Sequence, residues 1–184
     1  MKKNIFTFIS VFLALCFSSC GSEQQSEFRV DSTGVSPILL NLETDKIPPS
    51  YDKLYDEFKT ETINNDFDGS YTILHFRKAN KPIMDAYVYD DTIGSIEIFS
   101  SNIGSAEGIS PGSKVQNLFD KKGKANISND GQLSIVLGDL HYKVSGLKQA
   151  GDMKLQNAYA TGENPLITAE DFESSAKVES IVVY

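Results

Sequence analysis

The side chains with the clearest spacing for chemistry lie in residues 64–69, Asn-Asn-Asp-Phe-Asp-Gly. Asn64, Asp66 and Asp68 occupy positions 1, 3 and 5 of a calcium-binding EF-hand loop, and the glycine after them occupies position 6. Position 12 is His75, where the loop needs a bidentate Glu, and a strand pattern follows where the motif needs a helix. We therefore interpret the segment as an acidic turn between a helix and a strand, with calcium binding as the alternative.

Two histidines and one serine are the other candidates for metal binding or catalysis. His75 and His141 lie in predicted strands among apolar residues, and we interpret both as packed or surface side chains. Ser110 stands in Gly-Ile-Ser-Pro-Gly, which fits the letters of the Gly-x-Ser-x-Gly nucleophile motif. That motif follows a buried strand and opens a long helix, whereas Pro111 places this serine in a loop. We expect no catalytic residue, no cofactor and no enzymatic activity.

Tyrosines offer a third kind of site, a surface on which a ligand can stack. Tyr51, Tyr87 and Tyr89 are the candidates for such a platform. Tyr51 also belongs to an apolar stripe at helical spacing with Leu54, Tyr55 and Phe58, and core packing is the preferred interpretation of that stripe.

The N-terminus has the pattern of a secretory signal. Two lysines near the start precede the apolar run 5–17, which is too short to span a bilayer comfortably, and small residues then lead to Cys20. Cys16 lies inside the apolar run, so cleavage before Cys20 would leave Cys20 as the sole thiol of the mature chain. An unpaired exposed thiol is reactive, and acylation would remove that liability.

The sequence Phe17-Ser18-Ser19-Cys20 resembles the lipobox of bacterial envelope lipoproteins. The resemblance implies that residues 1–19 are removed and that Cys20 carries the lipid. Gly21 stands where an Asp would mark retention in the inner membrane, so the resemblance implies outer-membrane placement, on a face that it leaves open. The alternative is an ordinary secretory signal that leaves Cys20 as a free thiol.

Composition limits the remaining possibilities. Removal of 19 of the 184 residues leaves about 165, enough for one domain, and loss of the two lysines changes the formal net charge from −8 to −10. An acidic chain without a large basic cluster argues against nucleic-acid binding. Without a cysteine pair there is no disulfide framework, so stability must come from burial, for which 11 Phe and 8 Tyr are present.

The chain divides into a signal peptide (1–19), a polar tether (20–35) and a single α+β domain (36–184). Alternating and β-branched segments predict an antiparallel sheet of roughly six to eight strands, with helices over residues 50–61 and 113–119 covering one face. Within the domain, residues 104–119 resemble a turn-then-helix segment, GIxxGSxxxxLF, of small envelope lipoproteins. That resemblance implies a fold element and no activity.

Three functions are compatible with this pattern. The first is a lipid-anchored envelope protein that binds or helps to assemble another envelope protein. The second is a binding module for a small ligand or glycan that uses exposed tyrosines. The third is a hydrolase whose site is formed by loops, which would need a pocket of mutually hydrogen-bonded titratable groups.

Overall fold

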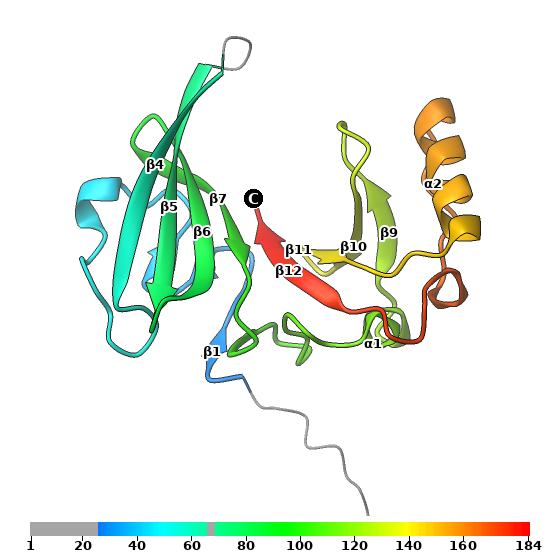
Figure 1. The fold of residues 1–184 in the computed structure, drawn as a ribbon, viewed down its shortest axis with the longest axis horizontal. Coiled ribbons are helices and arrows are strands. Elements are labelled where there is room, and N and C mark those ends of the chain that lie inside the picture. Colours follow the sequence, from blue (N-terminus) through cyan, green and yellow to red (C-terminus); the bar gives the residue numbers. More distant parts are fainter. Residues whose placement is uncertain (1–25, 66–68) are drawn as a thin grey trace, which may run out of the picture.

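One antiparallel sheet of eight strands dominates the computed structural model, which describes residues 26–65 and 69–184 (Figure 1). The expectation of a mainly antiparallel sheet with two α-helices is confirmed. The sheet bends between β7 and β12, so that its two halves form two arms with the end of β12 between them. In spatial order the strands are β4 (Glu57–Asn65), β5 (Gly69–Lys78), β6 (Lys81–Tyr89), β7 (Thr92–Ile98), β12 (Val178–Val183), β11 (Leu140–Val144), β10 (Leu133–Leu137) and β9 (Lys124–Ile127).

Short elements surround this sheet. Two minor pairings join β1 (Phe28–Arg29) to β8 (Ile103–Gly104) and β2 (Gly34–Val35) to β3 (Ile38–Leu39). The α-helices are α1 (Val115–Asp120) and α2 (Gln149–Thr161), and the 3₁₀ turns are η1 (Thr44–Lys46) and η2 (Ala169–Asp171).

Residue alternation gives the sheet one apolar face and one polar face. On β7, Ile96 and Ile98 are fully buried in the core, while Glu97 between them points to the other face. On β6, Met84 and Ala86 face the core and Asp85 faces away. The alternation predicted from the sequence is thus confirmed, and the polar face becomes available for a site.

The N-terminal segment covers much of the apolar face, which corrects the expected tether. Val30 and Val35 are each 1% exposed and belong to the core cluster, and the Asn41 amide donates to the Ile93 carbonyl. A tether therefore does not extend to residue 35, because β1 and β2 are part of the packed domain. The predicted signal peptide, Cys20 and the first residues of the expected tether lie outside the described residues.

We expect Val35→Ala to lower the free energy of unfolding by about 2 kcal/mol, because two buried methyl groups are lost and a small cavity remains. The matched control is Ser32→Ala, three residues away at an exposed position, which should change it by less than about 0.5 kcal/mol. Urea denaturation measures both. Equal, small effects would mean that this segment is a tether after all.

The predicted helix over residues 50–61 is wrong. Residues 51–55 form a tight turn in which the Tyr55 amide donates to the Tyr51 carbonyl, and β4 begins at Glu57. Leu54 and Tyr55 are buried as expected, but a turn places them in the core, where the Tyr55 hydroxyl donates to the Pro48 carbonyl at 2.6 Å. The Thr-Glu-Thr-Ile sequence that follows favours a strand, and this local preference outweighed the helical spacing.

The second predicted helix is confirmed, whereas the longest helix of the described chain was missed. Residues 113–119 were expected to form a helix, and α1 spans Val115–Asp120 with Val115 and Leu118 buried. No helix was predicted over the residues of α2, which buries only Gly151 and Ala158 and so lacks an apolar stripe. Of the two covering helices predicted, one is therefore present, and irregular N-terminal chain takes the place of the other.

Among the helices of residues 26–65 and 69–184, none is long and apolar enough to cross a bilayer.

Candidate functional site

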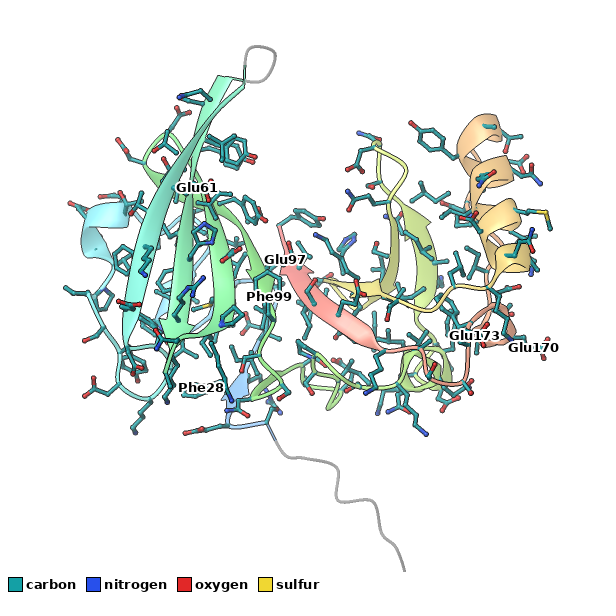
Figure 2. The ribbon with its side chains drawn as sticks, in the orientation of Figure 1. Phe28, Glu61, Glu97, Phe99, Glu170 and Glu173 are labelled. Carbon is teal, nitrogen blue, oxygen red and sulfur yellow. The ribbon has the colours of Figure 1, made fainter. Side chains whose placement is uncertain are left out.

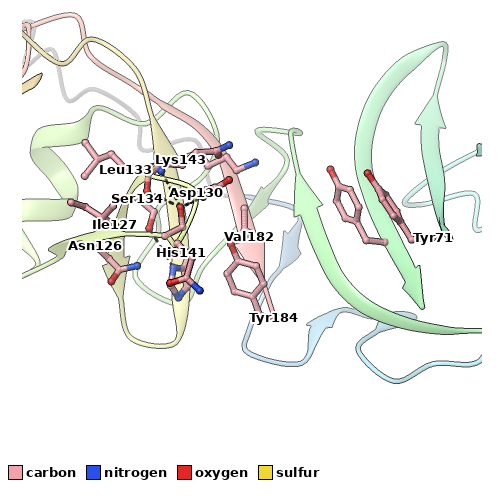
Figure 3. A pocket seen from close by; sticks show the side chains of 14 residues that line it. Tyr71, Asn126, Ile127, Asp130, Leu133, Ser134, His141, Lys143, Val182 and Tyr184 are labelled. Atoms are coloured by element: carbon pink, nitrogen blue, oxygen red, sulfur yellow. Dashed lines mark hydrogen bonds between the residues drawn. The ribbon is translucent and has the colours of Figure 1, made fainter. Parts of the chain in front are cut away.

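The polar face of the sheet is hollowed into a cleft of about 840 Å³ between the two arms (Figure 3). Strands that lie far apart in the sheet line the same hollow, because the sheet bends in the middle. The lining consists of aromatic, carboxamide, hydroxyl and a few charged side chains: Tyr71, Tyr87, Asn126, Ile127, Ser128, Asn129, Asp130, Gln132, Leu133, Ser134, His141, Lys143, Val182 and Tyr184.

Tyrosines form one wall of the cleft. Tyr71 on β5 lies with its ring centre 6.4 Å from that of Tyr87 and 5.8 Å from that of Tyr89, both on β6. Tyr89 is 50% exposed and Tyr87 is half-buried. Of the tyrosines proposed from sequence, Tyr87 and Tyr89 thus form a cluster with Tyr71, while Tyr51 is exposed in the 51–55 turn and is not part of the cleft.

The opposite wall is the hairpin that joins β9 and β10, whose turn has the sequence Asn-Asp-Gly at residues 129–131. Ser128 donates its hydroxyl to the Asp130 carboxylate and accepts a hydrogen bond from the Gln132 amide at 3.0 Å. The Ser128 hydroxyl lowers the pKa of Asp130, so this carboxylate is ionised at neutral pH. Tyr159 of α2 lies against Gly131 and donates its hydroxyl to the Asn129 carbonyl, which fixes the hairpin from behind.

A buried carboxylate, Glu97, lies beneath the middle of the cleft (Figure 2). It is 8% exposed, and Lys143 Nζ lies 2.9 Å from its carboxylate. The Ser180 hydroxyl donates to Glu97 Oε1 at 2.6 Å, and the Tyr87 hydroxyl lies 3.4 Å from Oε2. Burial, followed by the negative charges of Glu97 and Asp85, raises the pKa of Tyr87 to about 12, so the tyrosine keeps its proton.

Two carboxylates face each other across neighbouring strands at this point. Asp85 on β6 is directly opposite Glu97 on β7, an arrangement in which like charges repel. Each has its own partner: His75 Nδ1 lies 2.8 Å from Asp85, and the Lys143 ammonium group binds Glu97. His75 Nε2 also lies 3.0 Å from the Glu61 carboxylate, so the imidazole lies between two carboxylates, one on β4 and one on β6.

Stability should depend on the protonation of His75. Burial alone would lower its pKa, but the hydrogen bonds and charges of Asp85 and Glu61 outweigh burial and raise the pKa above its ordinary value of 6.5. Because the folded pKa is the higher one, this contribution is complete below pH 6.5 and is lost as the pH rises through the folded pKa. His75→Gln should therefore lose more stability at pH 6 than at pH 9, and Asp85→Asn should lower the His75 pKa in an NMR titration. An unchanged pKa in Asp85→Asn would contradict the pairing.

The calcium hypothesis loses part of its structural basis. Asn64 lies in β4 and pairs with Ser70 of β5, so a strand, and not the expected helix, precedes the turn. Asp66 and Asp68 lie outside the described residues. Within residues 26–65 and 69–184, no group of three or more His, Cys, Asp or Glu side chains is placed to hold a metal ion.

The serine motif lies in a turn, as its proline suggested. The Ser110 amide donates to the Ser113 hydroxyl at 3.0 Å, in a turn that leads to the six-residue α1. The two histidines have other partners: His75 contacts Asp85 and Glu61, and His141 Nδ1 lies 3.3 Å from the Ser134 hydroxyl. Neither histidine is paired with Ser110.

Sequence reasoning missed the centre of this site. Glu97 lies in β7, but nothing local in the sequence shows that β7 pairs with β12, whose residues follow some 80 positions later. A charged residue between two isoleucines in a strand was the available signal. It marks an unusual position without naming Lys143 or Ser180 as partners.

No model of a known protein family matches this sequence, and a search of curated proteins finds no match. Among solved structures, the chain is similar to the crystal structure of the uncharacterized protein yfeY from Escherichia coli. The TM-score is 0.54 and the identity 20%, over 86% of this chain and 97% of that chain. At this identity the similarity concerns the fold alone.

Proposed function

We propose that this chain is a lipid-anchored, non-catalytic binding protein of the bacterial envelope, and that its binding site is the cleft on the polar face of the sheet. The anchor would be Cys20, acylated after removal of residues 1–19, with the outer membrane as the membrane reached. The lipid would then hold the domain at the membrane while the cleft binds a small ligand from the envelope.

The observation that supports the binding role most is the composition of the cleft. Its volume of about 840 Å³ is in the range of small-molecule sites. Tyr71 and Tyr87 supply ring surface, and the carboxamides of Asn126 and Gln132 supply directional hydrogen bonds. These features favour a small ligand over a flat protein surface as the occupant.

A binding role is favoured over hydrolysis by the state of the charged groups. Glu97 is held by Lys143 and Ser180, so the buried carboxylate and the amine satisfy each other. A general acid or base must instead be free to exchange a proton with a bound substrate.

The test is recovery of the natural ligand. The protein is purified from its own membranes in mild detergent and denatured, and the released small molecules are identified by mass spectrometry. A molecule that copurifies with the natural chain and is lost from Tyr71→Ala/Gln132→Ala supports the cleft as its site. The matched control is Tyr51→Ala, outside the cleft, which should retain the molecule. Recovery of nothing that depends on the cleft contradicts the binding role.

The anchor has its own test. The natural chain should carry acyl groups on Cys20, visible as an added mass on the N-terminal peptide, and should sediment with membranes. Cys20→Ala should be found in the soluble fraction. Equal sedimentation of both would contradict the lipid anchor.

A second candidate function, docking to an envelope protein, is favoured by exposed apolar side chains on and after α2. Leu166 is 86% exposed, and Met153 and Tyr159 are each 55% exposed. A photo-crosslinking residue at position 166 should give one discrete adduct in intact cells, and the same residue at exposed Glu163 should give less. Equal yields at both positions would count against a defined interface.

A further inference from the structure

The structure of the cleft leads us to a ligand class: we propose that it binds a neutral, hydroxyl-rich molecule, a saccharide, and that Glu97 sets this preference by neutralising Lys143. The inference rests on the proposed binding function and concerns the same site. Glu97 is a positioning and charge-setting residue, because it lies beneath the lining and acts through Lys143 and Tyr87.

The charge of the cleft is the first step. Lys143 is a cation in the lining, and alone it would attract an anion. Its ammonium group lies 2.9 Å from the Glu97 carboxylate, and the pair carries no net charge. Burial also lowers the pKa of His141, which keeps this imidazole neutral at pH 7. The remaining charged side chain is Asp130 at the hairpin, so an anionic ligand would meet repulsion there.

The remaining polar groups suit hydroxyl groups. The carboxamides of Asn126, Asn129 and Gln132 each offer donors and an acceptor, as a sugar hydroxyl does. Lys143 is 38% exposed and has three N–H donors, so at least one stays available to the cleft while another is held by Glu97. The Tyr87 hydroxyl points to Glu97, and its ring is left to the cleft.

Aromatic rings complete the match. A pyranose has an apolar face of C–H groups that packs on an aromatic ring, and tyrosine offers such a ring with a polar end. The Tyr71 and Tyr87 rings are inclined at 39° to each other, so they form a shallow curved wall and not a parallel slot for a planar base. A string of sugar rings fits a wall of this kind better than a flat heteroaromatic does.

The experiment compares matched neutral and anionic probes. Neutral tetrasaccharides of glucose, mannose and N-acetylglucosamine, and tetragalacturonate as the anionic probe, are titrated into the purified mature protein. Ring signals of Tyr71 and Tyr87, assigned with Tyr→Phe variants, report binding by NMR. We expect at least one neutral probe to bind about tenfold more tightly than tetragalacturonate, the scale of one unfavourable charge in a partly solvated site.

The variant Glu97→Gln should leave Lys143 with its charge uncompensated. Its preference should shift toward tetragalacturonate by about tenfold, the effect of exposing one cation to the ligand. The matched control is Glu163→Gln, an exposed carboxylate outside the cleft, which should keep the natural preference. Circular dichroism checks that both variants are folded.

The outcomes separate the two proposals. Preferential binding of the anion by the natural chain, or no shift in Glu97→Gln, overturns the inference while leaving a ligand site in place. The saccharide inference is also overturned if no saccharide changes the NMR signals of Tyr71 and Tyr87. The binding function is then decided independently by the mass-spectrometric recovery of the natural ligand.

Discussion

Replacement of Phe76 by alanine should lower the free energy of unfolding by about 3–5 kcal/mol, the range found for a fully buried phenylalanine. Phe76 on β5 is fully buried. The centre of its ring lies 4.8 Å from that of Tyr55, in an edge-to-face arrangement, and 5.3 Å from that of Phe58. The substitution removes the ring that joins β5 to both the edge strand β4 and the 51–55 turn. Tyr55 is not free to fill the space, because its hydroxyl donates to the Pro48 carbonyl.

Urea denaturation monitored by tyrosine fluorescence and circular dichroism would measure the loss. Tyr51→Ala is the control: it removes an aromatic side chain from the same turn at a position 40% exposed, and should change stability by less than about 0.5 kcal/mol. A loss below about 1 kcal/mol for Phe76→Ala would show that this aromatic cluster is not packed as described.

The strands were predictable because their signals are local. In the segment that became β5–β7, β-branched and aromatic residues alternate with polar ones, and Asn80 and Asp90 mark the turns with positive φ. Alternation also assigned Glu97 to the face opposite Ile96 and Ile98. Each of these inferences uses residues within ten positions of one another.

The helices were less predictable, for two physical reasons. Around Tyr55 and Phe58, apolar residues three apart suit a helical face, and the sequence does not show that a turn and a strand bury the same side chains. In α2 the opposite holds: Leu155 is partly buried, but Met153 and Tyr159 are each 55% exposed, so the apolar residues do not mark one buried face. What marks α2 is its content of good helix formers and Gly162, which ends it at φ 71°.

The site could not have been assembled from the sequence. Its walls come from β5–β6 and from the β9–β10 hairpin, which are brought together by the bend between β7 and β12. No local motif marks the tyrosines, the carboxamides or Glu97 as members of a site. The order of the strands in the sheet brings them together. In a sequence without a specific motif, such as this one, a candidate site becomes visible only in the folded structure.

Variants of the Lys143–Glu97 pair test whether the domain needs this pair for its stability or for the polar groups of the cleft. Lys143→Met should lower the free energy of unfolding by about 2–4 kcal/mol, because it leaves a buried carboxylate without its cation. The loss of stability stays below that of a fully buried pair, because the Lys143 side chain is 38% exposed and water can reach the vacated position.

The triple variant Lys143→Met/Glu97→Met/Ser180→Ala should recover most of that stability. Buried ion pairs replaced by apolar residues of similar size are often neutral or stabilising, and Ser180→Ala avoids a hydroxyl without a partner. If urea denaturation shows this recovery, the folded domain does not need the pair for its stability. The presence of Lys143 and Glu97, which apolar residues can replace without loss of stability, would then be explained by the charged and polar groups that they provide to the cleft. A triple variant less stable than Lys143→Met alone would instead make the pair a structural requirement of the bend in the sheet.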